Sequence, residues 1–194
     1  MEEKNPIWGY FVDIIETIVV AAAIFVVVYL FLLQPHQVRG ASMEPNLSDG
    51  QYILTDKISY RFEKPRRGDI IVFKAPVDEN FDYIKRIIGL PGESIQIKDG
   101  EIIIKNPEHP KGFVLEEPYK INGSDQPGSL LEDNKEFKVS EDNYFVLGDN
   151  RNQSFDSREW GELSRKNIKS HNFHLLLLLI LRKFNPSGNA RAEG

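Results

Sequence analysis

The chain has 194 residues, a formal net charge of −5 at pH 7 and no cysteine. Without cysteine it has no disulfides, no zinc–thiolate site and no cysteine nucleophile, and its acidic charge argues against a nucleic-acid partner. Its four histidines are scattered and form no helix-spaced pair with a carboxylate, so we expect neither a metal site nor a cofactor.

An apolar stretch near the amino terminus predicts a membrane anchor. Residues 12–33 contain two charged residues, Asp13 and Glu16, and a helix over this stretch would be about 33 Å long, enough to cross a bilayer. A cleaved secretory signal is the alternative. However, the apolar run is too long for one, its leading segment is more acidic than basic, and no small-x-small site follows Leu33. We therefore expect residues 1–35 to be an uncleaved anchor in the lipid bilayer.

From Gln51 onwards the pattern is typical of β structure. Short runs of β-branched and aromatic residues occur at 52–55, 69–73, 83–88, 137–139 and 144–147. The strongest local signal is a pair of runs joined by Asp99 and Gly100, which supply the positive φ angles of a tight hairpin. The sequence thus predicts a mainly β fold, in which one transmembrane helix precedes an antiparallel β domain over residues 36–184.

Three stretches of the chain are less regular. Residues 106–135 contain four prolines and several glycines among polar residues, which predicts an insertion or exposed loop rather than core. The seven apolar residues at 175–181 would span only about 10 Å as a helix, so we expect a buried strand or a short core helix there. Residues 185–194 are expected to form a disordered tail.

Candidate chemistry lies in three polar stretches. Ser42 lies between Gly40 and Pro45 just after the anchor, although a serine in such a place most often bonds its own backbone. Lys85 lies in a predicted strand whose alternation puts it on one face with two apolar residues, although lysines on strand edges are also common solubility devices. Residues 148–158 form a polar loop after an apolar strand, and plain surface is its simplest reading.

A serine hydroxyl becomes a nucleophile only when a base removes its proton, and no histidine stands in a suggestive position. An ordinary lysine has a pKa of about 10.4, so only about one amine in a few thousand is neutral at pH 7. Burial lowers that pKa, and a value of about 7–8 requires roughly 4 kcal/mol of differential solvation. Because its strand is rich in apolar residues, Lys85 meets this demand better than the other lysines of the domain.

Together the three stretches resemble the signature boxes of the type I signal peptidases, which are membrane-anchored Ser/Lys proteases. Residues 42–45 match the Ser-Met-x-Pro box, residues 82–93 match the lysine box, and residues 148–158 match the final Gly-Asp-Asn-Arg box. Their order and their position after an anchor also agree. Two departures stand out: Asn46 replaces the usual threonine, and residues 167–184 do not resemble the family's last core strand.

The resemblance implies a role for each matched residue. Ser42 would be the acylating nucleophile, with its backbone N–H in the oxyanion hole, and Lys85 would be the general base. Ser154 would orient Lys85, and Asp156 and Arg158 would pair near the site. The substrate would bind as an added β-strand in a groove lined by Met43, Asp82, Tyr83 and Ile84.

The implied function is the removal of signal peptides from exported preproteins, with cleavage after small-x-small sites such as Ala-x-Ala. The resemblance places the protein in the bacterial plasma membrane with its catalytic domain on the outer face, and flanking charge does not set this orientation. Its partners would be preprotein signal peptides and lipid, without nucleic acid or metal. Two alternatives remain open. One is a related Ser/Lys self-cleaving protein, although such proteins carry a DNA-binding domain in place of an anchor, and the other is a catalytically inactive, membrane-tethered β binding module.

Overall fold

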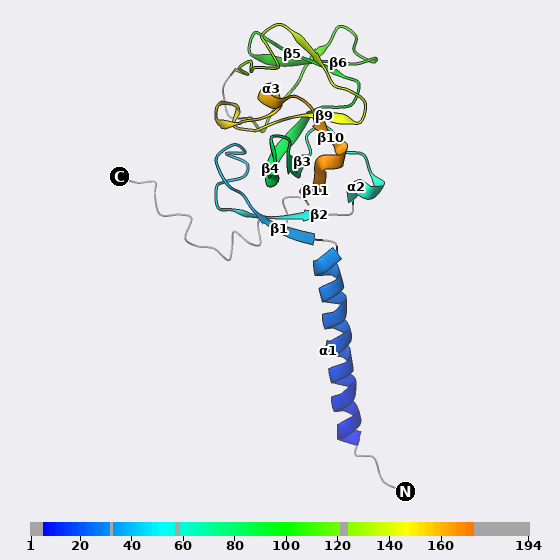
Figure 1. Cartoon of the computed structure of the whole chain (residues 1–194). Coiled ribbons are helices and arrows are strands. Elements are labelled where there is room, and N and C mark those ends of the chain that lie inside the picture. The colour runs from blue at the N-terminus through cyan, green and yellow to red at the C-terminus, as the bar shows by residue number, and fades with distance from the viewer. Residues whose placement is uncertain (1–5, 32, 57–58, 121–123, 173–194) are drawn as a thin grey trace, which may run out of the picture.

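A long apolar helix begins the part of the chain that the computed structural model describes, which comprises residues 6–31, 33–56, 59–120 and 124–172. Helix α1 (Pro6–Phe31) starts with a proline, whose missing N–H is unneeded at that position, and it is about 39 Å long. Its segment Trp8–Val27 is long and apolar enough to cross a membrane, and none of this segment is buried inside the protein. In Figure 1, α1 stands clear of the rest of the chain, which is the arrangement expected of a helix surrounded by lipid.

The main sheet has seven strands, its paired strands are all antiparallel, and it carries Lys85, while Ser42 lies in the turn between its first two strands. The strand order is β1-β2-β11-β3-β4-β9-β10. The strands are β1 (Leu33–Gln37), β2 (Tyr52–Asp56), β3 (Ile70–Ala75), β4 (Asp78–Gly89), β9 (Asn143–Leu147), β10 (Leu163–Ser164) and β11 (Ile168–Asn172). This sheet confirms the predicted mainly β, antiparallel fold.

A second sheet of four strands lies at the end of the β domain away from α1 (Figure 1). Its order is β7 (Phe113–Val114), β6 (Glu101–Lys105), β5 (Ser94–Lys98) and β8 (Glu136–Lys138). The predicted hairpin joins β5 to β6, and its turn residues Asp99 and Gly100 have φ angles of 52° and 76°. An Asp-Gly pair tolerates these angles, which explains the strong local signal.

The remaining short elements are single turns of helix. They are α2 (Ser59–Phe62), α3 (Ser157–Trp160), and the 3₁₀ turns η1 (Arg151–Gln153) and η2 (Arg165–Asn167). The turns η1 and then α3 follow β9 in the chain, so both belong to the final polar loop that this strand leads into.

The core consists of buried apolar side chains on both sheets. One cluster joins residues of the second sheet, such as Ile97, to Phe145 and Leu147 of β9. Another cluster holds the loop after β1 against the first sheet through Met43 and Val72. Apolar burial therefore fixes the loop that carries the candidate nucleophile.

One expectation needs correction, and the structure also shows what becomes of one departure from the family pattern. Residues 106–135 are not simply an exposed loop, because Leu131 is fully buried in the core and Asp125 is buried as well. The last core strand is present although its sequence does not resemble the family's, because β11 pairs with both β2 and β3. The expected strand or helix at 175–181 and the expected tail at 185–194 lie outside the described residues.

Candidate active site

Ser42 lies in a turn that the protein holds in place from both sides. The backbone bonds Val38 N to Gln51 O, at 2.8 Å, and Gly50 N to Val38 O, at 2.9 Å, close the base of the loop. Gly40 has a φ of +82°, which L-residues rarely adopt, and this angle lets the chain turn just before the serine. Next to the half-buried Ser42, Met43 is fully buried and anchors the turn.

Lys85 lies on β4, opposite Ile71 of β3, and only 5% of its surface is exposed. Its Nζ lies 2.8 Å from Ser42 Oγ and 3.1 Å from the backbone oxygen of Ile84. Tyr83 and Ile87 belong to one apolar cluster, as the predicted alternation requires, and the Tyr83 ring centroid is 5.6 Å from Nζ. Strand β4 therefore places the Lys85 amine next to the Ser42 hydroxyl, in apolar surroundings.

Burial lowers the pKa of Lys85 from its ordinary value of 10.5 to about 8, because the charged amine loses hydration. The negative charges of Asp156 and Asp149 oppose this change and keep the pKa from falling further. A pKa near 8 leaves about one amine in ten neutral at pH 7. The structure thus supplies the apolar surroundings that a lysine base requires.

The final polar loop is built around a buried ion pair. Arg158 Nε lies 2.9 Å from Asp156 Oδ1, and both side chains are buried, which confirms the expected pairing. Asp156 also caps α3 by accepting from the Arg158 N–H, and it accepts a hydrogen bond from Gly148 N at 3.2 Å. The loop contacts the turn of Ser42 through Asn150 N, which donates to the Ser42 carbonyl oxygen at 3.1 Å.

Ser154 does not make the expected hydrogen bond to Lys85. Its Oγ is buried and has no hydrogen-bond partner among the described residues. It lies instead against Gly148, which is also close to the Ser42 backbone: a Cβ added at Gly148 would be 2.3 Å from Ser154 Oγ and 2.5 Å from the Ser42 carbonyl oxygen. The Lys85 amine bonds to Ser42 Oγ and Ile84 O instead.

The residues expected in the substrate groove fall into two groups. Met43 and Ile84 pack in the same apolar cluster, and Met43 is only 1% exposed, so it acts here as core. Tyr83 packs edge-on against Phe73, while Asp82 is more exposed and forms an ion pair of 2.7 Å with Lys169.

One edge of β4 is open beside Lys85. Strand β3 pairs with β4 along residues 82–86, whereas β9 pairs with it only from Arg86 onwards. Within the described ranges, no strand pairs with the other edge at residues 82–84. The backbone there is therefore available to an added strand.

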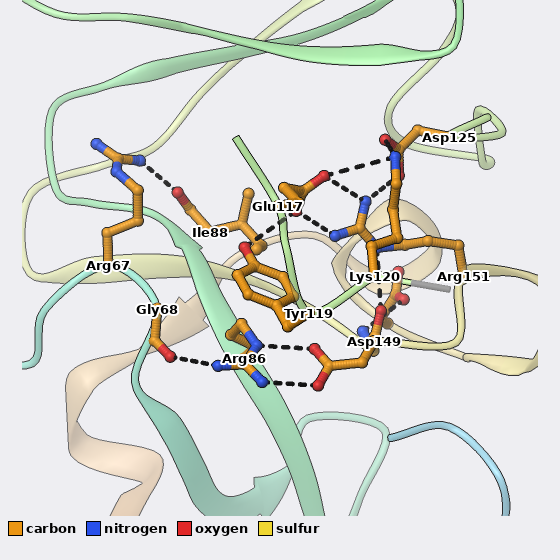
Figure 2. A network of polar contacts seen from close by, with 12 residues as sticks. Arg67, Gly68, Arg86, Ile88, Glu117, Tyr119, Lys120, Asp125, Asp149 and Arg151 are labelled. Atoms are coloured by element: carbon orange, nitrogen blue, oxygen red, sulfur yellow. Dashed lines mark hydrogen bonds and ion pairs between the residues drawn. The ribbon is translucent and has the colours of Figure 1, made fainter. Parts of the chain in front are cut away.

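The sequence interpretation missed a polar network around this site, shown in Figure 2. Arg86 binds Asp149 through two hydrogen bonds of 2.8 and 2.7 Å, and Asn46 donates to Asp149 Oδ2 at 2.9 Å. Asn46 is therefore more than a polar replacement for threonine. Arg86 and Asp149 lie within the matched boxes, but only the fold shows that they meet.

In the part of the chain that the structure describes, no group of three or more His, Asp or Glu side chains is placed to hold a metal ion. The polar groups of the site are the hydroxyl of Ser42, the amine of Lys85 and the surrounding ion pairs.

A membrane-spanning helix, an antiparallel β domain, and a serine beside a buried lysine define an anchored hydrolase of the serine class. The sequence model of the signal peptidases, peptidase family S26, matches residues 11–176, and the chain belongs to this family.

Three known proteins illustrate the similarity. The chain is 37% identical to signal peptidase I of Leptolyngbya laminosa, over 79% of this chain and 73% of that protein. It is 39% identical to signal peptidase I V of Bacillus subtilis, over 69% of this chain and 79% of that protein. This chain also resembles the crystal structure of a signal peptidase I from Enterococcus faecalis, with a TM-score of 0.46 and 30% sequence identity. The match covers 57% of this chain and 98% of the Enterococcus faecalis chain.

Proposed function

We propose that this membrane-anchored serine endopeptidase removes signal peptides from exported preproteins, with Ser42 as the nucleophile and Lys85 as the general base. The observation that carries the proposal is the 2.8 Å separation of Lys85 Nζ and Ser42 Oγ, combined with the lowered pKa of the buried amine. Family membership supports the substrate class.

Acylation begins from the neutral amine. Lys85 Nζ accepts the Ser42 hydroxyl proton while Oγ bonds to the scissile carbonyl carbon and gives a tetrahedral oxyanion. The resulting ammonium then donates its proton to the leaving amine as the C–N bond breaks. The products of this half-reaction are the released mature amino terminus and an acyl ester on Ser42.

Deacylation repeats the same proton transfers with water. Neutral Lys85 accepts a proton from water, the hydroxide attacks the ester carbonyl, and the ammonium returns a proton to Ser42 Oγ as the signal peptide leaves. One amine thus serves both half-reactions, so its pKa must lie near the working pH.

The backbone of Ser42 is suited to stabilising the oxyanion. Its carbonyl is fixed by Asn150 N, and among the described residues its N–H makes no hydrogen bond. A free, oriented N–H donor of this kind typically contributes a few kcal/mol to transition-state stabilisation. Gly40, two residues earlier, has no side chain to add a second donor.

The open edge of β4 supports substrate binding as an added strand. Residues 82–84 offer backbone groups directly before Lys85, so a peptide paired there would pass its scissile bond over the Ser42–Lys85 pair. Ile84 on this edge is half-buried and packs in one apolar cluster with the buried Met43, so Ile84, supported by Met43, would offer small side chains a shallow apolar surface. The proposed specificity is therefore small-x-small, such as Ala-x-Ala.

The proposed location is the bacterial plasma membrane, with the β domain on the outer face. Helix α1 leads into β1, and only β1 and the start of the loop after it separate the anchor from Ser42 (Figure 1). This short connection keeps the site near the lipid surface where a translocated signal peptide emerges.

The test is a cleavage assay with the full chain in detergent and a preprotein whose signal ends in Ala-x-Ala. Ser42→Ala and Lys85→Met are each expected to abolish cleavage while near-ultraviolet circular dichroism remains that of the wild type. Cleavage retained by either variant would contradict the mechanism. A folded wild-type chain that binds but never cuts preproteins would favour the inactive binding module.

A further inference from the structure

Two carboxylates from the loop between the second sheet's strands β7 and β8 are buried beside the site. Their side chains are 3% exposed for Glu117 and fully buried for Asp125. Burying charge is costly unless partners compensate for the lost hydration. Nothing in the Ser42–Lys85 mechanism uses these two groups, so their burial calls for another role.

Both carboxylates converge on Arg151, the arginine of the Gly-Asp-Asn-Arg motif that begins the final box (Figure 2). Glu117 binds both terminal nitrogens of its guanidinium, one of them at 3.0 Å, and Asp125 binds one. Lys120 supplies the second positive charge, with its Nζ 2.8 Å from Asp125 Oδ2. Two anions and two cations balance, so the buried cluster is neutral.

Arg151 in turn fixes the turn that holds the nucleophile. Its Nε donates to the Gly148 carbonyl at 3.0 Å, and its own carbonyl accepts from Arg158 Nη2 at 2.6 Å. Between these two anchored residues lies Asn150, whose N–H bonds the Ser42 carbonyl oxygen. Glu117 and Asp125 are therefore connected to Ser42 by the Arg151 guanidinium and by the short turn 148–151.

A neighbouring residue of the same loop makes a second, parallel link. The Tyr119 carbonyl accepts from Asn46 Nδ2 at 2.6 Å, and the Tyr119 ring lies under the Arg86 guanidinium, 3.9 Å from its centroid. Asn46 and Arg86 both bind Asp149, and Arg86 directly follows Lys85 on β4. The loop thus contacts the second and third stretches of the site, and also Asn46, the residue that directly follows the first.

We infer that Glu117 and Asp125 are positioning residues for signal-peptide cleavage, which hold Arg151 so that Ser42 stays aligned on Lys85; this rests on the proposed function. Neither residue touches the substrate or the reacting atoms. A misplacement of about 1 Å at a reacting centre can reduce a rate by roughly 100-fold. The loss of either carboxylate should therefore act on kcat rather than on KM.

The experiment compares Glu117→Gln with Glu132→Gln in the full chain in detergent. Glu132 lies in the same loop, but its pair with Lys135 is on the surface, with 59% of the Glu132 side chain exposed. Preprotein cleavage is measured at a temperature where near-ultraviolet circular dichroism shows each variant folded. We expect Glu117→Gln to lower kcat about 10- to 100-fold with KM within about threefold, and Glu132→Gln to match the wild type.

A double variant tests whether Glu117 acts through Arg151. Glu117→Gln combined with Arg151→Gln removes one charge of each sign and keeps the cluster neutral. If the inference holds, it is no slower than Arg151→Gln alone, because the two changes break one interaction.

Three results overturn the inference: multiplicative losses in the double variant, a folded Glu117→Gln chain with wild-type kcat, or a Glu117→Gln chain that does not fold, since this marks a purely structural role. In each of these the wild type still cleaves. A wild type that cleaves nothing overturns the proposed function, and this inference with it.

Discussion

The lowered pKa of Lys85 predicts a particular dependence of activity on pH. With a pKa of about 8, roughly one Lys85 amine in ten is neutral at pH 7, whereas an ordinary lysine with a pKa of 10.5 would supply about one in 3,000. Burial thus increases the population of active base about 300-fold at neutral pH. Because kcat/KM follows the free enzyme's base, it should rise nearly tenfold from pH 6 to pH 7, bend near pH 8 and then level off.

The assay uses the full chain in detergent and a fluorogenic peptide with an Ala-x-Ala site and no titrating side chain near the cleavage point. Initial rates well below KM give kcat/KM from pH 6 to pH 10. Circular dichroism at each pH confirms that the chain remains folded. Because the peptide has no titrating side chain near the cleavage point, a change in the substrate's charge cannot cause the pH profile.

Two outcomes would refute this reasoning. A profile that stays flat across neutrality would mean that no group with a pKa near 8 controls the attack. A profile that keeps rising beyond pH 10 would mean that the Lys85 amine is hydrated like a surface lysine, and the 5% exposure of the side chain would then not describe the working enzyme.

Three further predictions concern stability and packing. Gly148→Ala should lose activity and about 1–3 kcal/mol of stability to urea, because its Cβ would lie 2.5 Å from the Ser42 carbonyl oxygen and 2.3 Å from Ser154 Oγ. Phe145→Ala, at a fully buried site, should cost about 3–5 kcal/mol in the same measurement. Lys85→Met should stabilise the protein at pH 7 by up to about 3 kcal/mol, since the folded wild type holds its amine at a lowered pKa. Between pH 8 and pH 10.5 the unfolded chain binds more protons than the folded one, so wild-type stability rises with pH and this difference shrinks.

Each of these has a result that contradicts it. Wild-type activity in Gly148→Ala would show that the turn can move without disturbing Ser42. A loss below about 1 kcal/mol in Phe145→Ala would show that the core collapses around the cavity. A Lys85→Met gain that is the same at pH 7 and pH 10.5 would arise from packing rather than from the protonated amine.

Local chemistry explains why much of the fold was predictable from sequence. The Asp99–Gly100 pair predicts its hairpin because few other residues accept the positive φ angles of this turn. The apolar run of α1 and the alternation around Lys85 are likewise properties of neighbouring residues. The resemblance of the three boxes then placed Ser42 and Lys85 together, and the structure brings them to 2.8 Å.

The parts that sequence did not predict depend on contacts between distant segments. Glu117 and Arg151 are 34 residues apart, and a carboxylate among prolines has no local signal for burial. Strand β11 is specified by pairing with β2 and β3 rather than by its own polar residues. Gly148 approaches both Ser154 and the Ser42 carbonyl oxygen closely, and no periodicity in the sequence encodes this approach.

The open edge of β4 also exposes the molecule to self-association. Unpaired backbone groups at residues 82–84 would accept a strand from a second copy as readily as one from a preprotein. Beside β9 the edge is unpaired along residues 78–85 within the described part of the chain, and the Asp82–Lys169 pair places two charges on it, which discourages pairing with a strand of another molecule. A longer or more apolar edge on β4 would bind substrates more tightly, but it would also lower the solubility of the protein.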